Sequence, residues 1–348
     1  MNFDNSIITD KTNIVLFIYI YKKLKKNILV YCFVLTFITN VKAQDYHPHP
    51  LLSSSLKIET EYLTPSQVQD TSLKYSFGGS AFTFHFPLYT GKDWLSADGG
   101  KSFFAVLGDV GSTVREMNWD YLHPHRWLTT PSVGATALLA TGPSGLRNLY
   151  LVQLTTSMPS ESFTFNLSYF KIHGAFIWRR LYHNNRFWHT LGVVYSPLQG
   201  KDLPLPVIGG GYKINNENQI QLTLPFNAIY THKFSKQFSM SLKLHSMGYY
   251  NYLHADSIHN EQPLIFRDHF RKLSITCRYI TDRYVVLTPE IGIAGKSTLQ
   301  LNEWKTKQLA AIYFKLSLQI RFGKRPPASP ILNFDPGDSG FDPSYLVE

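Results

Sequence analysis

The most regular pattern in the chain lies near its end, in residues 311–322. Apolar residues occupy every second position: Ile312, Phe314, Leu316, Leu318, Ile320 and Phe322. Mostly polar residues fill the gaps between them. Because neighbouring side chains of a strand point to opposite faces, the segment predicts a strand with one apolar and one largely polar face. It is about twice as long as a usual strand of a soluble protein.

The same period of two recurs upstream. It is clear in residues 56–62, 163–169, 220–231 and 238–252, with Ile229 as an exception on the polar face. Helical periodicity is hard to find anywhere after residue 43. The pattern therefore predicts an all-β protein.

Turn-forming residues separate these segments at 183–186, 215–218, 234–237 and 281–283, whereas longer polar connections cover 253–263 and 296–307. Residues 118–131 contain a His-Pro-His run and predict a long loop or plug segment. The three glycines at 209–211 predict curvature or a bulge.

Many long amphipathic strands favour a closed transmembrane antiparallel β-barrel over a soluble β-sandwich. A bilayer requires every backbone polar group to be paired, with apolar side chains toward lipid and polar ones toward the lumen. Residues 55–322 number 322 − 55 + 1 = 268. At about 22 residues for each strand and its connection, they predict roughly 12 strands, within a range of 10 to 14.

The same alternation assigns faces to individual side chains. Lys243, Lys315 and Arg321 are expected to face the lumen, which would give it a preference for anions. Aromatic residues near strand ends are expected in interfacial girdles: Tyr250, Tyr252, Trp178, Trp188 and Trp304.

The front of the chain resembles an export signal. Four lysines between positions 22 and 26 precede an apolar run, and Val41-Lys42-Ala43 follows with small residues at the cleavage positions. We expect a signal peptide at 1–43, a flexible mature N-terminus at 44–54, the barrel at 55–323 and a Pro-, Gly- and Asp-rich periplasmic tail at 324–348. The alternatives for the unusually long leader are an uncleaved anchor and a misassigned start.

Charge and cysteine content exclude several classes of protein. The formal charge is +10, but six lysines and two aspartates lie in residues 1–43, which leaves 28 − 22 = +6 for the rest. Such a mild excess, without a long basic run, gives little support to nucleic-acid binding. Cys277 is the one cysteine outside the leader, so no intrachain disulfide is expected and an inert position on an apolar face is favoured.

Candidate chemistry is sparse. His123, His125 and Asp120 form the tightest group of metal-binding residue types, but their spacing matches no strong metal signature, and a polar loop is the default interpretation. No nucleophile motif such as G-x-S-x-G occurs. We therefore predict no catalytic residues, no metal and no cofactor.

The leader, the repeated amphipathic strands and the Leu316-x-Leu318-x-Ile320-x-Phe322 ending resemble outer-membrane β-barrels of Gram-negative bacteria. The stretch from Gly209 to His245 together with that ending is similar to an uncharacterised, porin-like barrel family common in Bacteroidota. The resemblance implies a location in the outer membrane, contact with its lipids and insertion by the barrel-assembly machinery. The 26 residues after Phe322 depart from the usual pattern, in which the signal ends the chain.

Three functions stay open at this stage. The first is binding or passage of small solutes through a polar lumen, and the second is a lipid-modifying enzyme. The third is a structural or surface-interaction barrel.

Overall fold

The computed structural model describes residues 54–90, 94–95, 101–120, 126–141, 146–161, 169–182, 186–195, 204–225, 227–253, 264–282, 285–295 and 297–322. Strands dominate these residues. No helix among them is long and apolar enough to cross a membrane.

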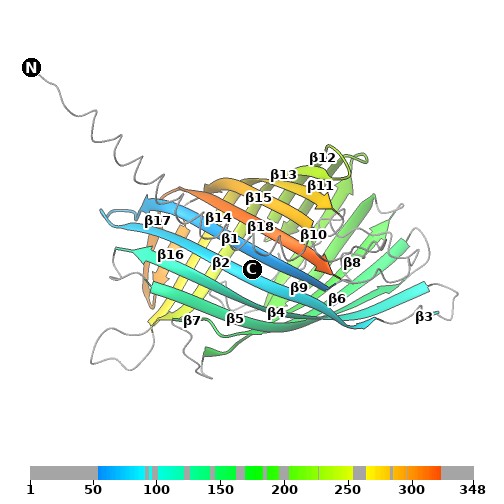
Figure 1. Ribbon diagram of the computed structural model, residues 1–348, viewed down its shortest axis with the longest axis horizontal. Helices are drawn as coiled ribbons and strands as arrows, with labels where there is room; N and C mark the ends of the chain where they lie inside the picture. Colours follow the sequence, from blue (N-terminus) through cyan, green and yellow to red (C-terminus); the bar gives the residue numbers. More distant parts are fainter. Residues whose placement is uncertain are drawn as a thin grey trace, which may run out of the picture. The chain divides into compact units, whose positions relative to one another are not determined.

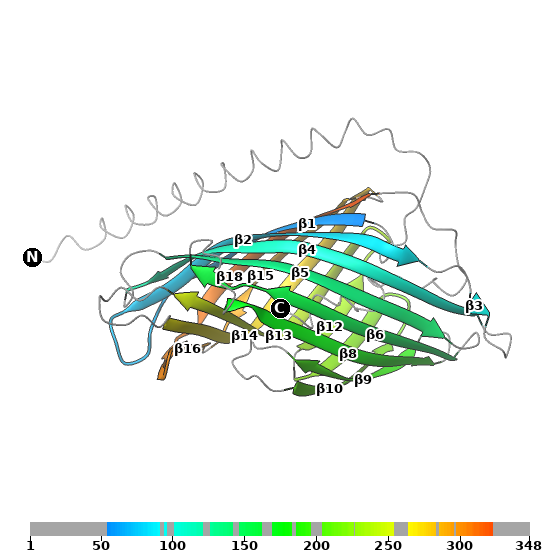
Figure 2. The same cartoon turned by 90° about the horizontal axis from the view of Figure 1, so that it is seen from below.

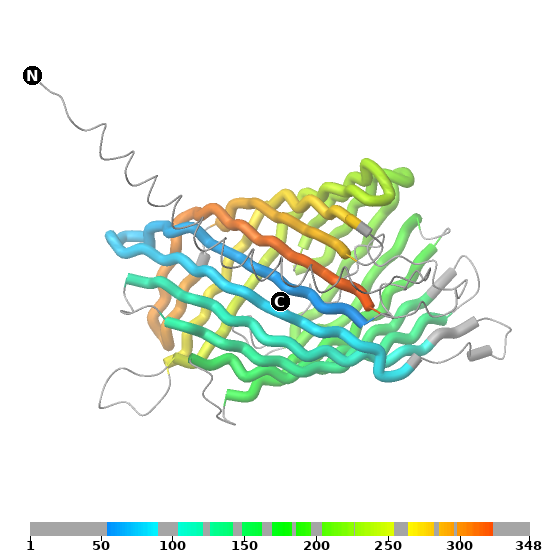
Figure 3. Tube along the Cα trace, in the orientation of Figure 1, coloured from blue at the N-terminus to red at the C-terminus, as the bar shows by residue number. Residues whose placement is uncertain are grey.

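In the described part of the chain, fourteen antiparallel strands form a closed ring (Figures 1 and 3). In ring order they are β1 (Ser54–Gln67), β2 (Lys74–Thr90), β4 (Lys101–Trp119), β5 (Arg126–Thr141), β6 (Leu146–Ser157), β8 (Lys171–Tyr182), β9 (Phe187–Tyr195), β10 (Pro204–Lys213), β11 (Asn218–Leu224), β12 (Asn227–Lys233), β13 (Phe238–Leu253), β14 (Leu264–Asp282), β15 (Val285–Ala294) and β18 (Ala311–Phe322). The ring closes where β1 pairs with β18, from Ser54↔Phe322 to Leu63↔Tyr313. The closed ring confirms the predicted barrel and excludes the sandwich.

The predicted range of 10 to 14 strands includes the observed number, but the value of 12 was too low. Residues 54–322 number 322 − 54 + 1 = 269, which is about 19 residues for each of fourteen strands rather than the 22 typical of spanning barrels. Short strands cause the difference, because β11 and β12 have only 7 residues each.

We call the end of the barrel where Ser54 meets Phe322 the terminal end, and the other the opposite end. At the terminal end, connections are short at 142–145, 183–186, 214–217, 234–237 and 283–284, whereas 91–100 is longer. The predicted turns at 183–186, 215–218, 234–237 and 281–283 therefore all fall at one end. The long connection predicted at 253–263 falls at the other.

The prediction of a long polar connection at 296–307 was wrong, because these residues form a β-hairpin. β16 (Ser297–Leu301) continues β15 along β14 after a register shift of one residue, and β17 (Trp304–Gln308) continues into β18. The turn at the tip contains Asn302, whose φ of 52° belongs to the left-handed region that asparagine tolerates. The sequence of β16 and β17 is largely polar because the outward side chains of this hairpin are exposed.

The loop predicted at 118–131 was also too long. β4 runs to Trp119, β5 begins at Arg126, and the two pair as far as Met117↔Arg126. Pro131 lies within β5, where its carbonyl accepts a hydrogen bond from the Met158 N–H at 3.0 Å. The His-Pro-His run itself lies outside the described residues, as does most of the predicted strand at 163–169.

The outer surface carries two successive rows of apolar side chains across β13, β14, β15 and β18. One row is Leu242, Ile275, Ile291 and Phe314, and the next, toward the opposite end, is Leu244, Leu273, Ile293 and Ile312. All eight are 42–56% exposed. Together with exposed apolar side chains on the other strands, these rows form the apolar belt.

The belt has the height of a bilayer. Ten residue steps separate Ile312 from Phe322, or about 33 Å along the strand and about 23 Å at a tilt of 45°, close to the roughly 25 Å of a membrane barrel. Within β18, Ile312, Phe314 and Phe322 are exposed, whereas Leu318 and Ile320 on the same face are buried.

Beyond the belt, toward the opposite end, the outward face of the strands becomes polar and the inward face becomes apolar. On β14, for example, Leu273 points outward and Lys272 inward, but higher up Arg271 points outward and Phe270 inward. The inward side chains here form one buried cluster, which we call the apolar cap: Leu63, Val68, Tyr75, Phe77, Met117, Trp119, Leu128, Met247, Leu253, Phe266, Phe270, Ala294, Leu299, Ala311 and Tyr313. The barrel therefore has a polar interior within the belt and a protein-like core above it.

Five strands, β8 to β12, do not reach the capped end (Figure 2). The ladder between β12 and β13 stops at Asn227↔His245, although β13 continues to Leu253. Above that point β13 instead meets β7 (Ser160–Glu161), through the parallel pair Tyr252↔Ser160. β7 continues the ladder that β6 forms along β5, so β5, β7 and β13 are successive neighbours at the capped end. The ring there is smaller and does not include β8 to β12.

Candidate functional site

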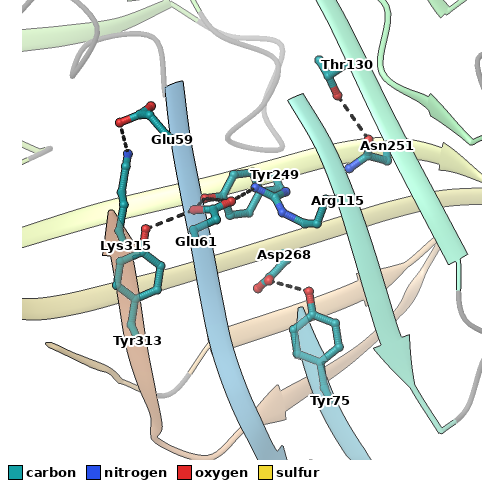
Figure 4. Close-up of polar contacts among 10 residues, drawn as sticks. All are labelled: Glu59, Glu61, Tyr75, Arg115, Thr130, Tyr249, Asn251, Asp268, Tyr313 and Lys315. Carbon is teal, nitrogen blue, oxygen red and sulfur yellow. Dashed lines mark hydrogen bonds and ion pairs between the residues drawn. The ribbon is translucent and has the colours of Figure 1, made fainter. Parts of the chain in front are cut away.

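A network of charged side chains lies inside the barrel, directly below the apolar cap (Figure 4). Its centre is Glu61 on β1. The carboxylate accepts hydrogen bonds from the Arg115 guanidinium at 2.5 Å, the Tyr249 hydroxyl at 3.1 Å and the Tyr313 hydroxyl at 3.0 Å. These partners come from β4, β13 and β18, so the network crosses the interior.

Two further groups of ion pairs complete what we call the ionic layer. Glu59 binds the ammonium groups of Lys315 at 3.0 Å and Lys57 at 3.2 Å. Glu290 binds Lys272 at 2.7 Å. The layer therefore consists of Lys57, Glu59, Glu61, Arg115, Lys272, Glu290 and Lys315, with nearly balanced charge.

Aromatic rings connect the ionic layer to the cap. The Arg115 guanidinium lies 3.2 Å from the ring centre of Tyr249 and 4.8 Å from that of Phe77, and the Lys272 ammonium lies 4.0 Å from that of Tyr313. Contacts of this kind stabilise cations that are removed from water. The layer is thus tied to the underside of the cap at several points.

One more polar contact crosses the cap itself. The Tyr75 hydroxyl on β2 donates to the Asp268 carboxylate on β14 at 2.8 Å, within the aromatic cluster. Side chains from opposite walls therefore meet at this level.

Nearer the belt's centre, β11 and β12 carry amide side chains on the interior face, and Lys213 of β10 pairs with Gln219 there. Gln219, Gln221 and Asn227 point inward from β11 and β12 and are 5–7% exposed. Their side-chain oxygens have no hydrogen-bond partner among the described residues. Since buried polar groups nearly always have partners, these amides, which we call the amide row, require water or a solute.

Trp188 lies in the interior and not in a membrane-interface girdle, so that prediction was wrong. It is 1% exposed, and its ring occupies the space left by Gly211, where a Cβ atom would overlap it. Arg179 lies beside it, with its guanidinium carbon 5.8 Å from the indole and its Nε donating to Thr190. The alternation around 183–186 changes phase across the turn, which is why sequence alone placed Trp178 and Trp188 together.

Other predicted girdle residues have distinct surroundings. Trp178 donates its indole N–H to Asn148 at 3.2 Å, and Trp304 stacks on Trp119 at 5.5 Å, over the cap. Tyr250 is buried beside Arg267, whereas Tyr252 stacks on Tyr169 at 4.5 Å.

The glycines at 209–211 form no bulge, because β10 keeps a continuous register with both neighbours. Cys277 is a free thiol, partly exposed, on the same face of β14 as Ile275 and Tyr279.

Among the predicted site residues, Lys315 belongs to the ionic layer. Lys243 and Arg321 lie on the same strand faces as His245 and Lys315, respectively. Asp120 accepts a hydrogen bond from the Lys74 N–H at 2.8 Å and so closes the start of β2. His123 and His125 lie outside the described residues, among which no group of three metal-binding side chains occurs.

Comparison with known proteins gives distant matches of shape. An outer-membrane channel from Pseudomonas putida F1 matches with a TM-score of 0.41 and 8% identity, over 81% of this chain and 100% of that one. The transport unit of the autotransporter AIDA-I from Escherichia coli matches with a TM-score of 0.33 and 9% identity, over 84% and 97%. The toluene transporter TodX from P. putida matches with a TM-score of 0.22 and 9% identity, over 81% and 92%.

These low TM-scores and identities assign neither a family nor an activity. No family model and no curated protein matches the chain. The similarity to a Bacteroidota barrel family therefore stays a hypothesis.

Proposed function

We propose that the chain is an outer-membrane β-barrel that admits small, uncharged polar solutes into its lumen. The closed ring, the apolar belt and its height support insertion into a bilayer, because a membrane tolerates β-structure only when no strand edge is exposed. Short connections at the terminal end support a periplasmic position for it. On this proposal, outer-membrane lipids surround the belt and the barrel-assembly machinery inserts it.

The amide row carries the proposal for the solute. The side-chain oxygens of Gln219, Gln221 and Asn227 are buried acceptors on the interior face without a hydrogen-bond partner among the described residues. Hydroxyl groups of a sugar-like solute match such amides, as water does. The row also lies on the side of β8 to β12, the strands that do not reach the apolar cap. We place the route of the solute along that side.

The ionic layer argues against a strong preference for anions. Lys315, which the sequence pattern placed in the lumen, is paired with Glu59, and Lys272 is paired with Glu290. Paired charges of both signs create little net field for a passing anion. Weak charge selectivity is therefore part of the proposal.

Liposome swelling with neutral sugars tests the proposal directly. The purified full chain should admit small sugars, and a Gln219→Leu/Gln221→Leu double variant should slow their entry severalfold. Gln237→Leu, in an exposed turn at the terminal end, is the matched control and should leave the rate unchanged. A barrel that is sealed to sugars and shows no conductance in planar bilayers would refute the proposal.

A non-enzymatic role belongs to the same proposal. Lipid A and phospholipid profiles of a deletion strain should match those of the parent. A changed profile would favour the lipid-modifying enzyme instead, whereas negative results in every assay would leave a structural or surface role.

A further inference from the structure

The outer face of the capped end is basic. Immediately above the apolar belt, β14 presents Arg267 and Arg271 outward, and β17 presents Lys305 and Lys307. We call these four residues the basic face. Figure 1 shows β16 and β17 side by side at this end of the barrel.

The strand register brings the four cations together. Arg267 pairs with Gln300 of β16, and Gln300 pairs with Lys305. One row nearer the belt, His269 pairs with Thr298, and Thr298 pairs with Lys307. Because neighbouring strands lie about 4.8 Å apart, the backbones of β14 and β17 are separated by about 10 Å.

None of the four forms an ion pair with another described residue. Arg267 makes a cation–π contact with Tyr250, 5.3 Å from the ring centre, which orients it without neutralising it. Arg271, Lys305 and Lys307 are exposed. Uncompensated positive charge on a folded surface favours an anionic partner.

Acidic side chains near the basic face do not change this balance. Asp268 points into the cap, where it accepts from Tyr75, and Glu303 lies in the turn beyond Lys305. Between the cations stand neutral hydrogen-bonding groups, Thr298, Gln300 and the Ser246–His269 pair, whose atoms lie 3.0 Å apart. The face thus combines charge with neutral hydrogen-bonding groups, and charged donors make the stronger hydrogen bonds to phosphate.

The position of the basic face selects the kind of anion. Arg271 lies two residues beyond Leu273, the last belt residue on β14, so its guanidinium sits where lipid tails give way to headgroups. Lys305 and Lys307 follow in the same direction past Ile312 and the exposed Leu309. Phosphate groups of a membrane lie at this depth, and basic residues there attract them.

We infer that the basic face binds a lipid that carries more than one phosphate, in the leaflet at the capped end. Four cations spread over two strands whose backbones lie about 10 Å apart favour a ligand with more than one phosphate. A lipid A-type headgroup, with two phosphates on a disaccharide, fits both the spacing and the neutral donors between. The inference rests on the proposed outer-membrane location.

The test measures binding of lipid A to the purified full chain in neutral detergent, by native mass spectrometry. A Lys305→Gln/Lys307→Gln double variant should bind bisphosphorylated lipid A about tenfold or more weakly. Arg186→Gln/Lys236→Gln removes the same charge from exposed turns at the terminal end and should bind as the unmodified chain does. Heat-modifiable gel mobility should be equal for all three proteins.

Dephosphorylated lipid A supplies the second arm. It should bind weakly to every form, with no difference between the two double variants. The inference is overturned if both double variants lose affinity equally, or if the dephosphorylated lipid binds as tightly as the phosphorylated one. Neither result depends on sugar entry, so failure of the lipid site and failure of the solute route are distinguishable.

Discussion

Arg115 reaches Glu61 across an intervening strand. The two residues belong to β4 and β1, and Gly79 of β2 stands between them in the register, Glu61↔Gly79↔Arg115. A Cβ atom on Gly79 would lie 3.5 Å from the Cβ of Arg115 and 3.0 Å from the Val114 carbonyl oxygen. The missing side chain is what lets the guanidinium lie over β2 and bind the carboxylate at 2.5 Å.

Replacing Gly79 with valine should therefore separate the ion pair. The larger side chain would occupy the path of Arg115, and we expect a loss of about 1 to 3 kcal/mol in the free energy of unfolding. Heat-modifiable gel mobility measures it as a lower unfolding temperature. Gly174→Val is the matched control, since a Cβ there meets only the Gln153 carbonyl at 3.7 Å. Equal stability of the two variants would show that Gly79 has no such role.

Removing the charge of Glu61 should be more costly than removing the whole pair. In Glu61→Gln the buried Arg115 loses its counter-charge, and a loss of about 3 to 5 kcal/mol is expected. In the double variant Glu61→Leu/Arg115→Met no charge is left uncompensated, so part of the stability should return. Thermal unfolding in detergent distinguishes the cases. A double variant less stable than Glu61→Gln would contradict this account.

The sequence predicted the strands and the faces within the belt well, because lipid outside and polar side chains inside give a strict period of two. Leu242, Leu244, Leu273 and Ile275 illustrate this regularity. Prediction failed where the faces exchange polarity. On β14 the inward side chain changes from the charged Lys272 to the apolar Phe270 two positions away. The inward face is therefore polar in one part of the strand and apolar in the other, and no single pattern of polarity runs through it.

The ionic layer and the cap were missed for a related reason. Glu61, Arg115 and Tyr249 are 54 or more residues apart in sequence, and Tyr249 of β13 reaches the other two only because the ring closes. Gly78-Gly79 interrupts the alternation of apolar and polar residues in the sequence, and Gly79 is the position that makes the layer possible. The sequence does hold one signal for the layer: an inward-facing glycine, Gly79, stands next to an inward-facing arginine, Arg115, on the neighbouring strand.

Gly211 should tolerate no side chain, because the Trp188 ring fills the space above it. Gly211→Ala would push the indole away from Arg179, and we expect a loss of about 1 to 3 kcal/mol from overpacking. The near-ultraviolet circular dichroism of the tryptophans should change with it. The same substitution at Gly174 should alter neither signal, and an unchanged spectrum in Gly211→Ala would contradict the interior position of Trp188.

The contact between β7 and β13 should be the weakest point of the smaller ring. It consists of the single pair Tyr252↔Ser160, supported by the stacking of Tyr169 on Tyr252 and by the Lys171 ammonium 5.4 Å from the same ring. Tyr252→Ala removes both supports, each worth about 0.5 to 1.5 kcal/mol, and should speed amide exchange at residues 158–161 by about tenfold. Tyr212→Ala, at an exposed position on β10, is the control. Because the ladder from β18 to β1 does not depend on this contact, exchange in β1 should stay unchanged, and a uniform acceleration over all strands would show that Tyr252 supports the whole barrel rather than this closure.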